Sequence, residues 1–130
     1  MKRVLTFGTF DIFHLGHLRI LERAASHGNE LVVGISSDKL NFKKKGRKPF
    51  YTEDERMHII SSLDFVSKVF LEESLELKRK YLLEHKADCL IMGCDWTGKF
   101  DEFSDICEVI YLPRTPDIST TELIEKIKTL

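Results

Sequence analysis

The sequence predicts one α/β domain in which five parallel strands form a doubly wound sheet. Two observations indicate this fold. The apolar runs are continuous rather than alternating, which is typical of strands covered on both faces. Helical patterns separate the runs, so strand and helix alternate along the chain. Ligands bind such sheets at the carboxyl ends of the strands, where the direction of the connections reverses.

Five β-rich apolar runs are expected to form the strands. They are Lys2–Gly8, Leu31–Ser36, Lys68–Leu71, Cys89–Met92 and Glu108–Leu112.

Four helices are expected between and after these strands, each with its own start or stop signal. Over His17–His27 apolar residues recur at helical spacing, and Gly28 then ends the helix. Capping boxes begin at Thr52 and Ser119, each with a Glu three residues later, and open helices that run to about Leu63 and Lys128. The remaining helix is expected over Leu75–His85.

Two segments fit neither pattern. Lys39–Tyr51 carries five positive charges between Lys43 and Lys48, and Pro49 follows them, so we expect a flexible basic loop. Gly93–Phe100 follows the fourth strand directly. Both segments leave the carboxyl ends of predicted strands, and we therefore expect them to meet at one edge of the sheet.

Composition fits a single small enzyme. At 130 residues and 42% apolar content the chain can fill one core, so residues 1–130 are expected to form one domain. The net charge of -1 gives no support to generic binding of nucleic acid or anionic membranes. Three cysteines without a CxxC pair indicate a reducing compartment. Met1 leads into a strand rather than a signal peptide, and we expect a cytoplasmic protein.

The first strand leads into a candidate phosphate site. After a tight corner at Gly8 and Thr9, two histidines, His14 and His17, flank Gly16 just before the first helix. Unpaired amides and the dipole at a helix N-terminus favour anions, and imidazoles add further donors. A structural histidine pair or an incidental metal pair is the alternative reading. Ser119 offers a second such place, because a helix cap can also cradle phosphate.

Three motifs carry a resemblance to a known family. They are Gly8-Thr-Phe-Asp-Ile-Phe-His14-Leu-Gly-His17, Gly93-x-Asp95-Trp96-x-Gly-Lys-Phe100 and Arg114-Thr-x-x-Ile-Ser119-Thr-Thr121. HxGH alone indicates a broad superfamily, shared with adenylyltransferases and some aminoacyl-tRNA synthetases. Together the motifs resemble the bacterial glycerol-3-phosphate cytidylyltransferases over essentially the whole chain. The resemblance implies a Rossmann-like fold of the HxGH nucleotidylyltransferase type and transfer of CMP from CTP to a phosphorylated polyol.

The resemblance also implies residue roles. Catalytic roles fall on His14, His17, Lys44 and Arg114. Nucleotide binding falls on Thr9, Phe10, Asp11, Gly16, Asp38, Arg47, Gly93, Asp95, Arg114, Thr115, Ile118, Ser119, Thr120 and Thr121. The acceptor is assigned to Lys44, Arg56 and Lys78. Mg²⁺ is expected to bind mainly through the CTP phosphates, with no protein ligands of its own, and the chain is expected to form a homodimer.

Departures from the family pattern concern the acceptor. Asp64–Ser67 stands where the family has Arg-Tyr-Val-Asp, Leu75 stands where it has tryptophan, and the basic segment is one residue longer. Ribitol phosphate, erythritol phosphate or a phosphorylated amino alcohol therefore stay open as acceptors beside glycerol 3-phosphate. An ATP-dependent adenylyltransferase and a nucleotide-sensing module are the alternatives from other classes.

Overall fold

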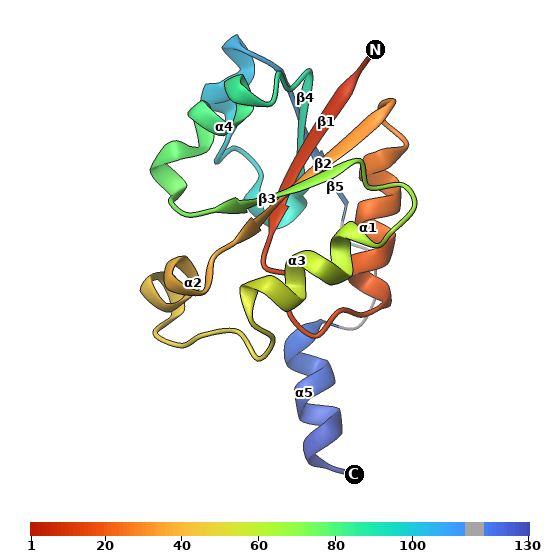
Figure 1. The fold of residues 1–130 in the computed structure, drawn as a ribbon, viewed down its shortest axis with the longest axis vertical. Coiled ribbons are helices and arrows are strands. Elements are labelled where there is room, and N and C mark those ends of the chain that lie inside the picture. Colours follow the sequence, from red (N-terminus) through yellow and green to blue (C-terminus); the bar gives the residue numbers. More distant parts are fainter. Residues whose placement is uncertain (114–118) are drawn as a thin grey trace.

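Five parallel strands form one sheet in the computed structural model, which describes residues 1–113 and 119–130 (Figure 1). The strands are β1 (Arg3–Gly8), β2 (Glu30–Ser36), β3 (Lys68–Glu72), β4 (Cys89–Gly93) and β5 (Glu108–Leu112). Their order is β3-β2-β1-β4-β5, and every neighbouring pair is parallel. The chain therefore winds outward in both directions from β1, which confirms the predicted doubly wound, Rossmann-like fold.

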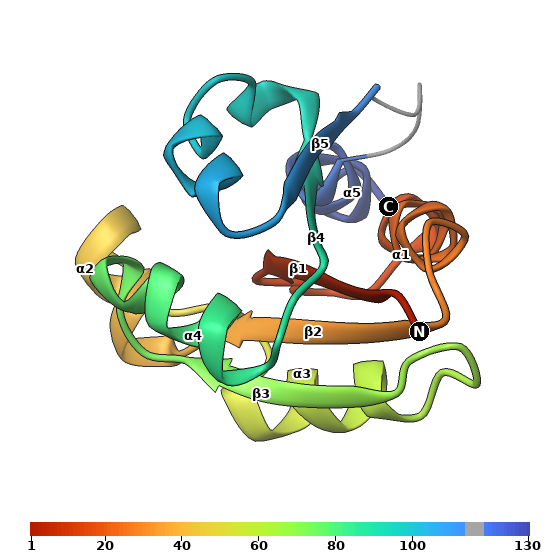
Figure 2. The same ribbon diagram turned by 90° about the horizontal axis from the view of Figure 1, so that it is seen from above.

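Helices cover both faces of the sheet (Figure 2). The helices of the described residues are α1 (Leu15–Ala25), α2 (Asp38–Lys45), α3 (Glu53–Ser61), α4 (Lys78–Glu84) and α5 (Thr120–Lys128), and α1, α3 and α4 pack on the sheet. One apolar cluster joins the sheet to α1 and α3, and a second joins its other face to α4 and the 3₁₀ turn Asp101–Asp105. Neighbouring residues of β1, Val4 and Leu5, belong to different clusters, because successive side chains in a strand point to opposite faces.

The predicted loop over Lys39–Tyr51 is wrong for its first half, which is helix α2. Ser37 caps this helix, its Oγ accepting from the amide of Leu40 at 3.0 Å, and Gly46 ends it with φ 74°. The lysines Lys43 to Lys45 occupy the last turn, where cations interact favourably with the helix dipole. The expected helix over Leu75–His85 begins with a 3₁₀ turn, Leu75–Leu77, before α4.

The helix α5 extends from the body of the molecule (Figure 1), and it has no buried residue. None of the helices in the described part of the chain has the length and apolar character needed to span a membrane.

Gly34 in β2 lies where the sheet has no room for a side chain. It pairs with Phe7 of β1 and with Phe70 of β3. These two rings meet edge to face, with centroids 5.7 Å apart. A Cβ atom at position 34 would lie 2.5 Å from Cδ1 of Phe7 and 2.9 Å from Cζ of Phe70. Only a residue without a side chain at position 34 leaves room for the Phe7 ring in its present place.

Replacing Leu90 by alanine should lower the free energy of unfolding by about 2–5 kcal/mol, because it removes a large side chain and leaves a cavity. Leu90 is fully buried in β4 beside Leu5 of β1. Chemical denaturation measures the loss. Leu83→Ala is the control, since that side chain is 56% exposed on α4 and its truncation should change stability little. Equal losses in the two variants would contradict the core assigned here.

Candidate active site

A cleft of about 700 Å³ opens at the carboxyl ends of β1 and β4, between the β1–α1 connection, the segment after α2 and the start of α5. Twelve of the residues assigned from the sequence line it: Thr9, Phe10, Asp11, His14, Gly16, His17, Arg47, Gly93, Asp95, Ser119, Thr120 and Thr121. Arg114, Thr115 and Ile118 lie outside the described residues. Asp38, Lys44, Arg56 and Lys78 are not part of the cleft lining.

The two imidazoles are oriented by backbone amides. His14 caps α1, and its Nδ1 accepts from the amide of Gly16 at 3.0 Å. Nδ1 of His17 accepts in turn from the amide of His14 at 3.3 Å. An accepting Nδ1 carries no proton, so in each neutral ring the proton is on Nε2. The rings stack with centroids 3.8 Å apart. Both histidines are thereby hydrogen-bond donors through Nε2.

A hydrogen-bond chain joins the histidines to α5. Nε2 of His14 lies 3.2 Å from Oγ1 of Thr120, whose hydroxyl donates to the carbonyl of Asp11 at 3.4 Å. Ser119 caps α5 through its Oγ, which accepts from the amide of Glu122. The N-terminus of α5 therefore faces the same cleft as the imidazoles, and it supplies a place where phosphate oxygens are favoured.

His17 is neutral at physiological pH. Its pKa is lowered to about 4, mainly by burial and also by the nearby His14, while Asp11 acts in the opposite direction. The neutral His17 ring can therefore donate a hydrogen bond through Nε2 without placing a positive charge beside the stacked ring of His14.

Hydrogen bonds of Asp11 connect the segment after α2 to the histidine loop, the β1–α1 connection that carries His14. Its carboxylate accepts from the amides of Phe50 at 2.7 Å, Tyr51 at 2.9 Å and Ile12 at 3.1 Å. Ile12 and Phe10 both have left-handed backbone conformations, with φ 46° and 54°. Such values are uncommon for large side chains, and the hydrogen bonds of Asp11 help to hold this turn.

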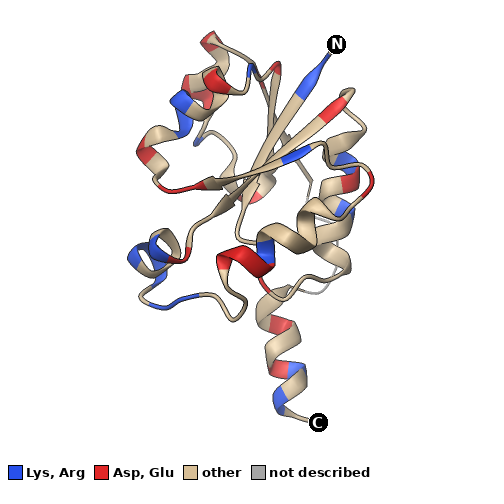
Figure 3. Ribbon diagram, in the orientation of Figure 1, with Lys and Arg blue, Asp and Glu red and all other residues tan. Residues whose placement is uncertain are grey.

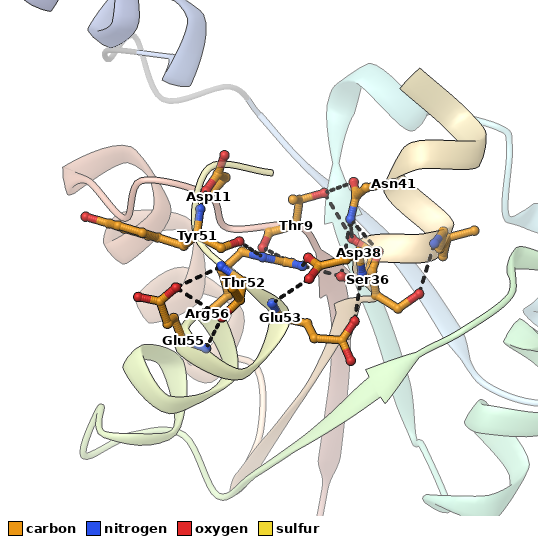
Figure 4. A network of polar contacts seen from close by, with 12 residues as sticks. Thr9, Asp11, Ser36, Asp38, Asn41, Tyr51, Thr52, Glu53, Glu55 and Arg56 are labelled. Atoms are coloured by element: carbon orange, nitrogen blue, oxygen red, sulfur yellow. Dashed lines mark hydrogen bonds and ion pairs between the residues drawn. The ribbon is translucent and has the colours of Figure 1, made fainter. Parts of the chain in front are cut away.

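The buried side chain of Arg56 in α3 forms hydrogen bonds to several segments next to the cleft (Figure 4). Its side chain is fully buried, and Nη1 donates to the carbonyls of Thr9 at 2.9 Å and Ser36 at 2.8 Å. Nε donates to the carbonyl of Tyr51 at 3.1 Å, and Nη2 pairs with Oδ1 of Asp38 at 2.7 Å. The guanidinium assigned to the acceptor from the sequence is thus occupied by four protein oxygens.

Asp38 and Asn41 extend this network into α2 (Figure 4). The amide of Asp38 donates to Glu53, whose own amide donates back to Oδ2 of Asp38. The side-chain amide of Asn41 donates to the carbonyl and the hydroxyl of Ser36, and its oxygen accepts from the hydroxyl of Thr9 at 2.9 Å. The orientation of α2 is therefore tied to the ends of β1 and β2.

Cations gather at the end of α2 and in the segment after it (Figure 3). Lys45, Arg47 and Lys48 line the cleft, and the exposed aromatic rings of Phe50 and Trp96 also contribute to its walls. The sequence leaves open which residues of this basic run face the site, and Lys45 and Lys48 are lining residues without an assigned role. A lysine run shows where charge is concentrated, but the backbone conformation of α2 and of the segment after it decides which side chains line the cleft.

Within the described residues, no group of three His, Cys, Asp or Glu side chains is arranged to hold a metal ion. The Asp11 carboxylate at the cleft is engaged by three amides.

Comparison with known proteins agrees with this geometry. The family described as cytidylyltransferase-like matches residues 5–126. A protein of Bacillus subtilis named glycerol-3-phosphate cytidylyltransferase is 45% identical, over 98% of both chains. A Staphylococcus aureus protein of the same name is 39% identical, over 98% of this chain and 96% of its own. A lipopolysaccharide core biosynthesis protein of Thermoplasma volcanium superposes with a TM-score of 0.75 at 27% identity, covering 88% of this chain and 98% of its own.

The depressed pKa of His17 gives a measurable pH dependence. Its NMR signals should stay those of a neutral ring until the pH falls to about 4. Because the unfolded chain binds this proton at about pH 6.5, the free energy of unfolding should fall as the pH drops from about 6.5 to 4. The His17→Gln variant identifies the signals and should lack this part of the pH dependence. A titration of His17 centred near pH 6.5 would contradict the assignment.

Proposed function

The chain belongs to the cytidylyltransferase-like family, and from this premise we propose that it transfers the cytidylyl group of CTP to glycerol 3-phosphate, giving CDP-glycerol and pyrophosphate. The observation that carries the proposal is the convergence of two Nε2–H donors, the N-terminus of α5 and three cations on one cleft. Relatives that match over nearly their whole length and bear this activity in their names support the same substrates.

The reaction is an in-line displacement at phosphorus. A phosphate oxygen of the acceptor attacks the α-phosphorus of CTP, the bond from that phosphorus to the bridging oxygen breaks, and pyrophosphate leaves. This chemistry needs no covalent intermediate with the protein. It needs two anions brought together and stabilisation of the charge that grows on the phosphoryl and leaving oxygens.

In the proposed mechanism, His14 and His17 donate through Nε2 to the α-phosphate and the departing β-phosphate. Ser119 and Thr120 at the N-terminus of α5 hold the β- and γ-phosphates. Asp95, which also lines the cleft, binds the ribose or the cytosine amino group. Arg47 and Arg114 supply charge to the triphosphate, since a guanidinium can contact phosphate through two N–H groups.

The acceptor is proposed to bind through Lys44 and Lys78. Lys78 forms an ion pair with Glu72, and the pKa of Lys44, which burial lowers, is raised by the charge of Glu72. Arg56 is proposed to hold the segments around the cleft in place through its four protein partners, and not to contact the acceptor directly. Mg²⁺, bound mainly through the CTP phosphates, would supply further charge neutralisation.

A homodimer and a cytoplasmic location complete the proposal. The exposed apolar side chains of Ile127 and Leu130 at the end of α5 are consistent with a contact to a second copy. Free cysteines at positions 89, 94 and 107 are consistent with a reducing compartment.

Replacing His14 by alanine should lower kcat by about 100- to 1000-fold, because a donor to the charge formed in the transition state is lost. The Kd for CTP should change by much less, about threefold, since the other phosphate contacts remain. Pyrophosphate release and equilibrium CTP binding measure the two effects. His58→Ala is the matched control, because His58 is exposed on α3. Turnover of His14→Ala close to that of the wild type would favour a nucleotide sensor instead.

The choice of nucleotide tests the proposed function most directly. CTP should exceed ATP at least about 100-fold in kcat/KM, because groups that hydrogen-bond cytosine are left unpaired by a purine. Pyrophosphate release is measured with each of the four nucleoside triphosphates against glycerol, ribitol and erythritol phosphates and a phosphorylated amino alcohol. Comparable rates with ATP would identify an adenylyltransferase, and a preference for another acceptor would correct the assignment of glycerol 3-phosphate.

A further inference from the structure

A buried ion pair lies beside the cleft, on the face of the sheet that α4 covers. Nζ of Lys78, in the first turn of α4, is 3.0 Å from Oε2 of Glu72, the last residue of β3. Only 4% and 3% of the two side chains are exposed. Burying two charges is costly, and an ion pair of this kind is weak evidence for stability alone. Its position at the carboxyl edge of the sheet points to a role in the site.

Aromatic rings fix the ammonium from its other sides. Nζ of Lys78 lies 4.0 Å from the centroid of the Phe7 ring and 4.9 Å from that of Phe100. Phe7 also lines the cleft, so the ring that carries the buried cation is itself part of the site. An ammonium has three N–H groups, and in the described part of the chain Glu72 is the one carboxylate paired with it.

The Glu72 carboxylate also acts on a second cation, Lys44 of α2. Burial lowers the pKa of Lys44, the charge of Glu72 raises it, and Lys45 and Lys78 lower it. Beyond its ion pair, Oε2 of Glu72 has no hydrogen-bond partner among the described residues. Glu72 therefore pairs directly with the ammonium of Lys78, and its charge also acts on Lys44 at the end of α2. Together the two ammonium groups and the one carboxylate carry a net charge of +1.

We propose that Glu72 is a positioning residue, which holds the Lys78 ammonium against Phe7 and keeps Lys44 and Lys78 together as a site for the acceptor's phosphate. This role rests on the proposed function, in which these two lysines bind the acceptor. Glu72 contacts no substrate itself. It determines where the two cations lie and whether they are charged when the acceptor arrives.

Protonation is the part of this role that can be measured. Burial lowers the pKa of Lys78, and Glu72 raises it. From the elements packed against Lys78, the charged groups are Glu72 on β3 and Lys44 on α2, while β1 presents the Phe7 ring. Asp101, next to Phe100, accepts instead from the hydroxyl of Tyr111, and the hydroxyl of Tyr81 on α4 accepts from the amide of Glu73. Removing the Glu72 charge should therefore lower the pKa of Lys78 further.

The test is the Glu72→Gln variant, compared with Glu73→Gln, its exposed neighbour. In Glu72→Gln we expect the KM for glycerol 3-phosphate to rise about tenfold or more, while the KM for CTP changes less than about twofold. The alkaline fall in kcat/KM for the acceptor should move to lower pH by about one unit or more, because Lys78 loses its proton earlier. Glu73→Gln should behave like the wild type, and Glu72→Asp should recover part of the loss.

A second readout does not depend on turnover. The ¹³Cε and ¹⁵Nζ signals of Lys78, identified by their loss in Lys78→Arg, should titrate at lower pH in Glu72→Gln than in the wild type. An unchanged Lys78 titration overturns the proposal. So do equal increases in both KM values with an unmoved pH profile, which indicate a structural role only. If Glu72→Gln does not fold, an unchanged acceptor KM in Glu72→Asp overturns it as well. A wild-type protein that turns over no polyol phosphate refutes the proposed function, and the Lys78 titration then still decides whether Glu72 keeps that cation charged.

Discussion

The fully buried guanidinium of Arg56 is the interaction on which the arrangement of the cleft depends. A charge without water needs protein acceptors, and this one has the carbonyls that end β1 and β2, the carbonyl that precedes α3, and the Asp38 carboxylate in α2. A planar group with five N–H donors can satisfy all of them at once. The ends of two strands and the starts of two helices are thereby held in one geometry, and the histidine loop follows directly from the first of them.

Charged and neutral donors are separated within the cleft. The imidazoles next to the proposed reaction centre are oriented by amides, and burial keeps His17 neutral. The cations come from the end of α2 and the segment that follows it. A neutral donor can strengthen its hydrogen bond as negative charge grows on a phosphoryl oxygen, while fixed cations offset the repulsion between two anionic substrates. This separation of neutral imidazole donors from fixed cations suits a reaction whose rate depends mainly on substrate positioning and charge neutralisation.

Much of this molecule could be predicted from its sequence, because its strands are continuous apolar runs and most of its helices begin with recognisable caps. The HxGH loop, the capped start of α5 and the segment after β4 could be brought to one edge of a parallel sheet by topology alone. Helix α2 was missed because its lysines obscured the cap at Ser37 and the stop at Gly46. The surroundings of Arg56 could not be foreseen, because its partners are mostly backbone carbonyls, which every residue type carries.

Gly34 shows how far a restriction at one backbone position can reach. A methyl group there would push the Phe7 ring, and the Lys78 ammonium rests on that ring. Gly34 lies in the middle of a strand, carries no charge and contacts no proposed substrate group. It nevertheless limits the position of the Lys78 ammonium through the Phe7 ring. Among natural variants of this chain, position 34 should therefore admit a side chain only where the residues at positions 7 and 70 leave room for it. The residue types allowed at these positions are therefore coupled to one another.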